Sequence, residues 1–531
     1  MRKGYDAPVR TLAFSVIAVL AACGNHHPQH GDGGGGGGDA TADAFAGPFG
    51  DFPAAPIIDT GAPADSGMLF GDPAQGAQTG GPCMVEPEVG TLYPQNWLRP
   101  RFTWIPSGTE NFFELRLTAS NQINPLVVYT TATTWTMPAD LWAGLAAHTV
   151  DQPIQVTLRG ATLSGATLAG GPELGSKGGI SIASASAPGA IVYWTTSGGT
   201  GLRGFKIGDE TVQDVVRPAD ASTQCVGCHS STPDGTYVGF SASQQPGNGD
   251  PATLGLLTSD GTKMTPPFIT ASAQTLMARQ EQQSPTFSRM HWQAGDHVAV
   301  NMFPVNAKFE IMWTDLEAAS TDQGTGWGII ARNGDANMAA SASFAHTSDT
   351  LLYTSAPMVS SGVTTTSGDI ATVPYGNRAG GTATKIAGAS DPAFNEYYPT
   401  FAPDDALIAF NRVTDGSSSY NNAAAEVFVI PSAGGTAVRI AANDPPACSG
   451  KTSPGVTNSW AKWAPGATQI GSKTYYWLTF SSTRTGNPQL YVTPVLFDGH
   501  TISTFPALYL WNQPAAENNH TPAWDDFTIL Q

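Results

Sequence analysis

Residues 224–235, QCVGCHSSTPDG, contain the side chains with the clearest chemistry in this chain. Cys225, Cys228 and His229 form the pattern C-x-x-C-H. Two thiols at this spacing can each form a thioether with a haem vinyl group, and the adjacent imidazole can ligate the iron. The spacing predicts covalent attachment of one haem c, with His229 as an axial ligand.

Other chemistry also fits these three residues. The two thiols can close a C-x-x-C disulfide that staples a loop. A zinc site needs further Cys or His close by, and His229 is the only local one. A thioredoxin-like redox motif would sit in a βαβ pattern, which the flanking sequence lacks. Haem attachment and a disulfide therefore both remain open.

A sixth iron ligand would have to come from elsewhere in the chain. His520 comes directly before the last unit of the repeat described below, and Met277 lies seven residues before the unit at Ser284. Both are expected on the side of the fold where residues 225–229 lie, and His520 is preferred. An iron without a sixth protein ligand would be open to small molecules.

Cys83 and Cys448 are two further cysteines that need an explanation. In an oxidising compartment, two such cysteines suggest a disulfide, which would tie the N-terminal part of the chain to the repeats. Two free thiols are the alternative.

The N-terminus has the pattern of an export signal. Basic residues accompany an apolar run, residues 11–22, which is too short to be a stable membrane span. The run ends in Leu-Ala-Ala-Cys23, which resembles the lipid-attachment box of bacterial lipoproteins. The resemblance implies a signal peptide over 1–22 and a lipidated Cys23. It implies the outer membrane of a Gram-negative bacterium, because Gly24 is not the aspartate that retains such proteins at the inner membrane.

Composition narrows the function classes. The chain has 531 residues and a net charge of −18, which argues against nucleic acid because such binding needs a basic surface. Charged residues are only 12%, and Gly and Pro number 60 and 40, which favours short strands joined by turns. The lipid would be the membrane anchor, since no later segment is long and apolar enough.

Two segments precede the repeats. Residues 23–82 contain a run of six glycines and little periodicity, which predicts a disordered tether. Residues 83–165 contain alternating runs such as RFTWIP and FFELRLTA, separated by turns, which predicts a small β-sandwich with Trp104 and Trp135 in its core. This segment resembles a fibronectin type III or immunoglobulin-like domain.

A long repeat occupies residues 180–531. Similar units begin at Ser284, Ser341, Tyr398, Trp460 and Thr521, with gaps of 57, 57, 62 and 61 residues, and Cys228 lies 56 residues before the first of them. A fixed period of this size indicates a solenoid, propeller or array, and strands without a helical pattern select the propeller. We expect Cys228 to be the sixth of these anchor residues, near the mouth of a central channel.

The repeat resembles the TolB-like propeller family, most closely at residues 399–410 and 232–242. The resemblance implies an all-β fold with six blades. The last unit, HTPAWDDF, has no blade after it, and residues 189–208 supply blade strands with no anchor before them. The C-terminal strand is therefore expected to close the first blade, because an open ring would expose two sheet edges.

These observations favour an electron-transfer protein of the cell envelope, with a redox partner docked at the propeller mouth. The alternative is a TolB-like scaffold that binds a protein or peptide, with Cys225 and Cys228 in a disulfide and no haem. A haem enzyme is a third possibility that no sequence feature demands. The chain has no G-x-S-x-G motif and no length for a hydrolase domain after the propeller.

Overall fold

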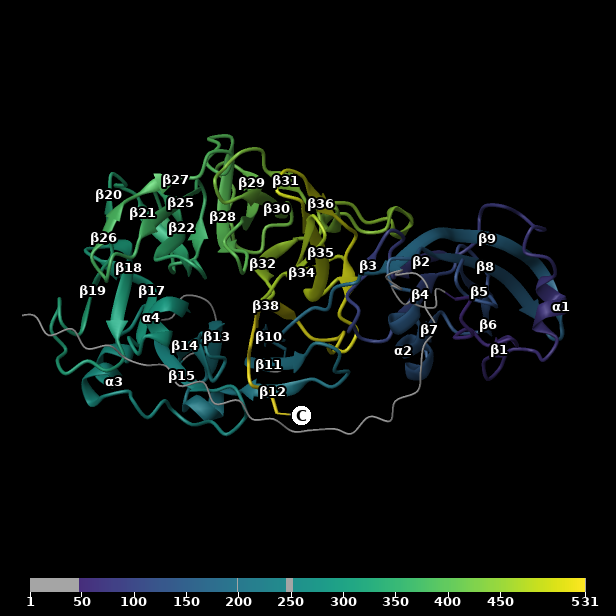
Figure 1. The fold of residues 1–531 in the computed structure, drawn as a ribbon, viewed down its shortest axis with the longest axis horizontal. Coiled ribbons are helices and arrows are strands. Elements are labelled where there is room, and N and C mark those ends of the chain that lie inside the picture. Colours follow the sequence, from purple (N-terminus) through teal and green to yellow (C-terminus); the bar gives the residue numbers. More distant parts are fainter. Residues whose placement is uncertain (1–46, 198, 245–251, 531) are drawn as a thin grey trace, which may run out of the picture. The chain divides into compact units, whose positions relative to one another are not determined.

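The computed structural model describes residues 47–197, 199–244 and 252–530, and the structure is built almost entirely of β-strands (Figure 1). The sequence predictions for the signal peptide and for Cys23 fall outside these residues. The described helices are few and short: α1 (Ser66–Phe70), α2 (Ala139–His148), α3 (Ala271–Met277) and α4 (Arg289–Gln293), with single 3₁₀ turns at Pro218–Ala221, Ala441–Asn443 and Ala447–Ser449.

Two sheets form the N-terminal part. One has the strand order β1 (Ile57–Ile58), β6 (Leu126–Thr130), β5 (Phe112–Ala119), β8 (Ile154–Ser164), β9 (Thr167–Ile182) and β3 (Leu92–Tyr93). The other has the order β2 (Cys83–Glu86), β4 (Arg101–Ile105) and β7 (Thr134–Thr136). Trp104 and Trp135 are buried, as predicted, and Trp104 packs edge-on against Phe113 of the larger sheet with ring centroids 5.4 Å apart.

The structure corrects the predicted tether. Residues 47–82 are not a structureless linker up to Pro82, because β1 pairs in parallel with β6 and Phe70 of α1 is buried. The buried guanidinium of Arg159 explains the docking. It pairs with Glu114 at 2.9 Å and also donates hydrogen bonds to the carbonyl groups of residues 70–72, which ends α1 against the sheet. The last strand of this part, β9, runs to Ile182, beyond the predicted limit at 165.

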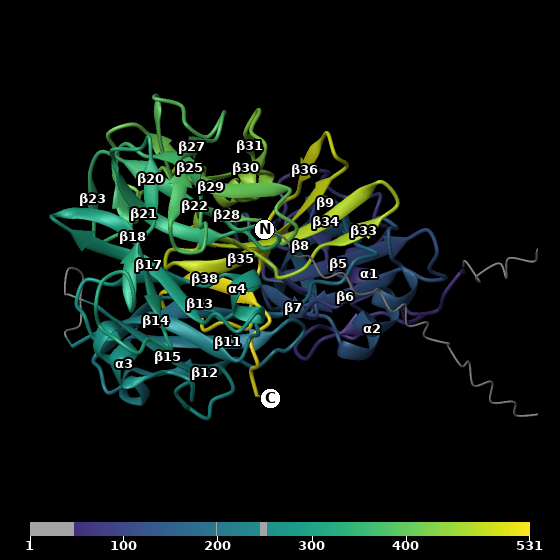
Figure 2. The same cartoon turned by 60° about the vertical axis from the view of Figure 1, so that its left-hand side comes forward.

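Six antiparallel sheets follow, arranged as in a β-propeller (Figures 1 and 2). The first sheet contains β38 (Asn519–Asp525), β10 (Ala190–Thr195), β11 (Gly201–Lys206) and β12 (Gln213–Val216). The second contains β13 (Cys225–Ser231), β14 (Tyr237–Ser243) and β15 (Thr253–Thr258). The third contains β16 (Gln283–Thr286), β17 (Val298–Val305), β18 (Lys308–Asp315) and β19 (Trp327–Ile329).

The other three sheets continue the series. The fourth contains β21 (Met338–Phe344), β22 (Thr350–Ala356), β25 (Asp369–Pro374) and β27 (Thr384–Lys385). The fifth contains β28 (Phe394–Phe401), β29 (Leu407–Thr414), β30 (Glu426–Pro431) and β31 (Val438–Arg439). The sixth contains β32 (Ser459–Trp463), β34 (Lys473–Ser482), β35 (Gln489–Phe497) and β36 (Ile502–Thr504). Short strands complete the set: β33 (Thr468–Ile470), β37 (Leu508–Tyr509), and the pairs β20 (Ala331–Asn333) with β26 (Gly380–Thr382) and β23 (Val359–Ser360) with β24 (Thr364–Thr365).

The C-terminal strand β38 is the first strand of the first sheet. It pairs antiparallel with β10, from Ala190 opposite Asp525 to Thr195 opposite Asn519. The first strands of the six sheets also contact one another in the order β13, β16, β21, β28, β32 and β38, and β38 contacts β13. Strands from the two ends of the repeat region therefore share one sheet.

The anchor residues of the repeat occupy one structural position. Ser284, Ser341, Tyr398, Trp460 and Thr521 all have φ between 50° and 62°, in the left-handed region that is unfavourable for residues other than glycine. Each is the first residue of a β-bulge, where the pairing of the first strand with the second shifts register. The repeat thus reflects a bulge in the first strand of each sheet.

This position corrects the alignment of the second sheet. Its register shifts between Val226 and His229, so Gly227 is the first bulge residue and Cys228 is the second. Gly227 lies 57 residues before Ser284, the same spacing as the next two units. Cys228 is therefore equivalent to the residues that follow the anchors. It is not an anchor itself, and it lies within strand β13.

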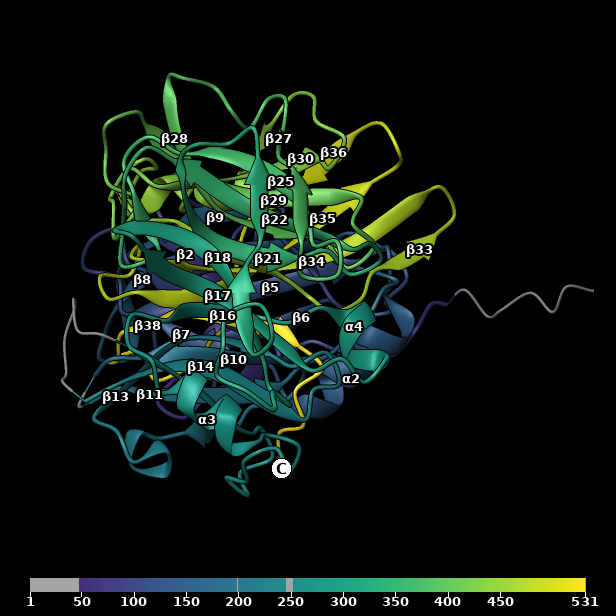
Figure 3. The same cartoon turned by 90° about the vertical axis from the view of Figure 1, so that its left-hand side faces the viewer.

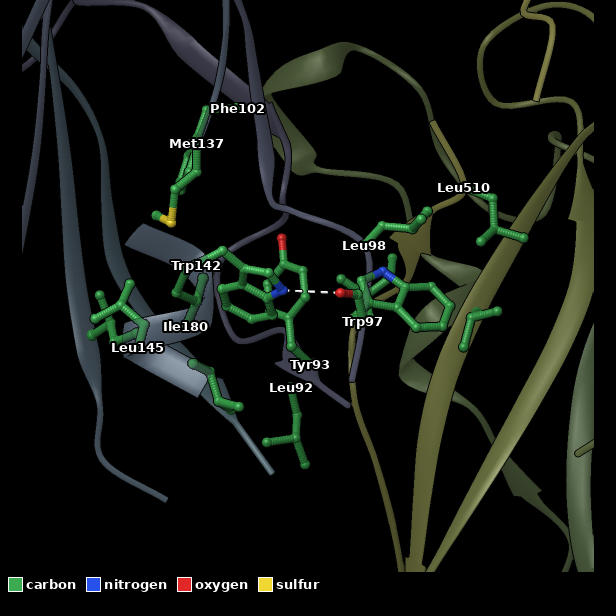
Figure 4. Packing of buried hydrophobic residues seen from close by; sticks show 14 of the residues in the cluster. Leu92, Tyr93, Trp97, Leu98, Phe102, Met137, Trp142, Leu145, Ile180 and Leu510 are labelled. Atoms are coloured by element: carbon green, nitrogen blue, oxygen red, sulfur yellow. Dashed lines mark hydrogen bonds between the residues drawn. The ribbon is translucent and has the colours of Figure 1, made fainter. Parts of the chain in front are cut away.

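A continuous core joins the N-terminal part to the propeller. Figure 4 shows Trp97 and Leu98 between Trp142 and Leu510 of the propeller, and the indole of Trp142 donates to the Trp97 carbonyl at 2.9 Å. The structure also has a disulfide between Cys83 of β2 and Cys448 of a loop that precedes β32. These contacts hold the two parts together.

Candidate functional site

The C-x-x-C-H residues lie on a β-strand. A regular strand alternates its side chains, so Cys225 and Cys228, three residues apart, would face opposite sides of the sheet. The bulge at Gly227 and Cys228 adds one residue to β13 and restores a common side. Both thiols consequently line one cavity of about 340 Å³ at the inner end of the second sheet.

The two thiols are free in the structure. The structure thus lacks the Cys225–Cys228 disulfide that the sequence left open. Burial raises the pKa of Cys228, while the neighbouring hydroxyl of Ser284 acts in the opposite direction. Both cysteines are half-buried, so each sulfur is accessible from the cavity.

Aromatic side chains form part of the wall of this cavity, which we call the thiol cavity. Trp194, Tyr420 and Trp460 line it together with the cysteines. Trp460 also stacks on Tyr398, with ring centroids 3.8 Å apart and planes 15° apart. A cavity of this volume with aromatic walls falls in the range of small-molecule and cofactor sites, which starts at about 300 Å³.

His229 follows Cys228 in β13 and is 8% exposed. Its Nε2–H donates to the carbonyl oxygen of Val192 at 3.1 Å, at the point where the pairing of β10 with β38 shifts register. Because a carbonyl only accepts, Nε2 carries the proton and Nδ1 keeps its lone pair. Nδ1 is buried and has no partner among the described residues. Burial lowers the pKa of His229 to about 4, so the ring is neutral at pH 7.

The two thiols fit covalent attachment of a haem, whereas His229 lines the central cavity described below and not the thiol cavity. The thiols are unbonded and share one aromatic cavity, as two thioethers require. Histidines that bind a metal commonly donate their other ring N–H to a carbonyl, which is how Val192 holds His229. In this arrangement the nitrogen available to a metal is Nδ1.

The two sixth-ligand candidates lie in different places. His520 of β38 is buried beside Trp194, its Nδ1 is 2.9 Å from the Thr521 hydroxyl, and its charge would interact with that of His229. Burial lowers the pKa of His520 to about 4. Met277 ends α3 (Figure 3) and is buried in a hydrophobic cluster with Trp292. Neither His520 nor Met277 lines the thiol cavity or the central cavity described below, and the sixth ligand stays a prediction.

A second cavity, of about 170 Å³, lies at the centre of the ring and is lined by the first strands of all six sheets. We call it the central cavity. Cys228 and His229 line it, and so does Lys462 of β32, which sequence reasoning missed. Lys462 is the second residue after the anchor Trp460, and this fixed offset from the repeat could have identified it. Burial lowers the pKa of Lys462 to about 8.

Comparisons with known proteins show likeness at the level of fold. No protein-family model matches the chain, and no curated protein does. Among solved structures, the β-propeller domain of the trilobed protease from Pyrococcus furiosus aligns with 66% of this chain and 87% of its own, at 8% identity and a TM-score of 0.30. A quinoprotein alcohol dehydrogenase-like protein from Bacteroides thetaiotaomicron aligns with 84% of this chain and 99% of its own, at 9% identity and a TM-score of 0.28.

A third solved structure is hydrazine synthase from Kuenenia stuttgartiensis. It aligns at 11% identity and a TM-score of 0.24, over 64% of this chain and 46% of that protein. The chain therefore spans less than half of that enzyme's length. At these identities and TM-scores the likeness is one of propeller architecture alone, and the functional argument below uses only the residues of this chain.

Proposed function

We propose that this protein is a lipid-anchored electron-transfer protein of the bacterial cell envelope that carries one covalently attached haem c on a six-bladed, TolB-like propeller. The observation that supports this most is the bulge in β13. It turns two free thiols toward one aromatic cavity, in a C-x-x-C-H motif that a regular strand would have split between two faces.

Cys225 and Cys228 would hold the haem. In this proposal each S–H adds across a vinyl double bond: a C–S bond forms, the hydrogen goes to the neighbouring vinyl carbon, and no oxidant is needed. His229 would be the residue to bind the iron, and its hydrogen bond to the Val192 carbonyl holds the ring in one tautomer. The bound haem would supply one-electron chemistry. The aromatic rings of Trp194 and Trp460 would shield its edge from water.

The rest of the chain would display this site. Six sheets whose first strands contact in series, with β38 paired to β10, are what a closed six-bladed ring requires. The two N-terminal sheets, with Trp104 and Trp135 between them, would form a fibronectin type III or immunoglobulin-like sandwich that begins before residue 83. A redox partner would dock at the mouth of the propeller beside the thiol cavity.

Location follows from the N-terminal sequence. The Leu-Ala-Ala-Cys23 box supports lipid attachment at the outer membrane, where the C-x-x-C-H motif would be outside the cytoplasm. Among the described residues, no helix is long and apolar enough to cross a membrane. In this proposal the lipid is the link to the membrane.

Covalent attachment can be tested by expressing the protein in a host that matures c-type cytochromes. We expect a denaturing gel to stain for haem and the intact mass to increase by one haem. The double variant Cys225→Ser/Cys228→Ser should lose both signals, whereas Ser360→Ala, which changes the same cavity without touching a thiol, should keep them. Wild-type protein with no haem and with a Cys225–Cys228 disulfide would overturn the proposal in favour of a binding scaffold.

A further inference from the structure

Lys462 is a cation inside the propeller whose electrostatic interaction, among the described residues, is with the Cys228 thiol. Its strand, β32, lines the central cavity, and its side chain is half-buried there. The amine has neither an ion pair nor a hydrogen bond with any described residue. Lys385, by contrast, pairs with Asp369 at 2.5 Å. An unpaired cation in the interior is costly, and a bound anion would offset that cost.

The same position in the other sheets is also polar. Two residues after the bulge begins, the six first strands carry His229, Thr286, Ser343, Thr400, Lys462 and Ala523, all lining the central cavity. Five of the six can hydrogen-bond. Hydroxyl groups here can act as donors to an acceptor ligand, because the Thr286 oxygen already accepts from the Phe344 amide and its own proton is free for another bond.

The charges that face this cavity favour an anion. Besides Lys462, the titratable side chains of its lining, leaving Cys228 and His229 aside, are Arg289, His346, Tyr398 and Asp525, and burial keeps the Tyr398 hydroxyl neutral by raising its pKa. The carboxylate of Asp525 accepts from the amide of Asp526. His346 is held by Asp405, and Arg289 lies 3.6 Å from the Asp526 carboxylate. Asp525 interacts electrostatically with Arg289 and His346, whereas Lys462 interacts in this way with Cys228 and, among the described residues, has no ion pair with a carboxylate.

Size sets the class of ligand. An apolar cavity of about 150 Å³ admits benzene, a molecule of six heavy atoms, so a cavity of about 170 Å³ has room for a ligand of similar size. We propose that the central cavity is a binding site for a small oxyanion or carboxylate, held by the ammonium group of Lys462 and by the hydroxyl groups of Thr286, Ser343 and Thr400.

This site is separate from the proposed haem attachment. Cys228 lines both cavities, but Lys462 and the three hydroxyl residues line only the central one. The inference therefore goes beyond the proposed function and does not require it. The anion would be held inside the ring, behind the thiols.

Sodium nitrate, acetate and phosphate serve as probes, with sodium chloride at equal ionic strength as the reference. Binding is measured by calorimetry and by fluorescence of Trp460 and Trp463, which flank Lys462. Wild type should bind at least one probe more tightly than chloride. Lys462→Met should weaken that binding about 10-fold or more, because a hydrogen bond to a charged group is lost. Lys462→Arg should retain most of it.

Lys473→Met is the matched control, since this lysine is exposed on the neighbouring strand β34, and it should bind as wild type does. Circular dichroism checks that Lys462→Met is folded. Equal binding by Lys462→Met and wild type would overturn the inference, as would wild type that binds none of the three probes. Cys225→Ser, which changes the thiol cavity without touching the lining of the central cavity, should also bind the probe. Loss of binding there would place the anion in the thiol cavity and would refute a separate site.

Discussion

The disulfide between Cys83 and Cys448 gives a prediction whose magnitude follows from its place in the chain. It closes a loop with a sequence separation of 365 residues. In the chain-entropy description, a cross-link of this length lowers the entropy of the unfolded chain by about 20 cal/mol/K, equivalent to about 6 kcal/mol at room temperature. Native disulfides that have been removed cost about 2–5 kcal/mol. We therefore expect Cys83→Ala/Cys448→Ala to lower the free energy of unfolding by about 5 kcal/mol.

The assay is equilibrium unfolding in guanidinium chloride, followed by tryptophan fluorescence and by far-ultraviolet circular dichroism. The dependence of the free energy on denaturant should steepen in the variant, because an uncrosslinked unfolded chain exposes more surface. The Cys225→Ser/Cys228→Ser variant removes two sulfurs that are not bonded to each other and is the control. A loss below about 1 kcal/mol, with an unchanged slope, would refute the argument that this bond constrains the unfolded chain.

Three further predictions concern the ring. Trp524→Ala, on the closing strand, should destabilise the protein by about 3–5 kcal/mol in guanidinium unfolding, because a buried indole bonded to a carbonyl at 2.8 Å is lost; a loss under about 1 kcal/mol would contradict closure by this strand. Ser341→Gly should raise the free energy of unfolding by about 1 kcal/mol, because glycine adopts the left-handed φ of 51° at this position without strain. Ser343→Gly on the same strand should lower the free energy of unfolding. Equal effects of the two substitutions would contradict backbone strain at Ser341. In the haem-free cysteine variant, the free energy of unfolding should fall by up to about 3 kcal/mol for each of His229 and His520 as the pH drops from 6.5 to 4, because the unfolded chain takes up these protons first. His520→Gln should flatten that pH dependence by about half, and an unchanged profile would show that His520 is not buried neutral.

Much of the propeller could be predicted from its repeat. The anchors at Ser284, Ser341, Tyr398, Trp460 and Thr521 recur because each sheet needs the same bulge, and a bulge restricts which residues can follow. The predicted anchor was displaced in one unit, the second, where Cys228 was taken as the anchor in place of Gly227, one residue earlier. A register shift in a single strand leaves no signal in the sequence other than that spacing.

Other features depend on contacts between distant residues and could not be found by local pattern. The folding of residues 47–82 depends on Arg159, which lies in a strand almost ninety residues later in the sequence. Its guanidinium donates hydrogen bonds to the carbonyl oxygens of residues 70–72. Helix α2 buries Leu141, Trp142 and Leu145 at helical spacing, a short pattern within a strand-rich segment. Lys462 was missed because a lone lysine in a strand ordinarily faces solvent, and only the ring places it inside.

The most direct test of the central claim is the visible absorption spectrum of the purified protein, reduced minus oxidised, from a host competent in cytochrome c maturation. We predict a Soret band and the difference spectrum of one haem per chain, retained after denaturation because the thioethers at Cys225 and Cys228 are covalent. The spectrum should be absent from the Cys225→Ser/Cys228→Ser variant. A colourless wild-type protein in which both thiols remain titratable would contradict haem attachment.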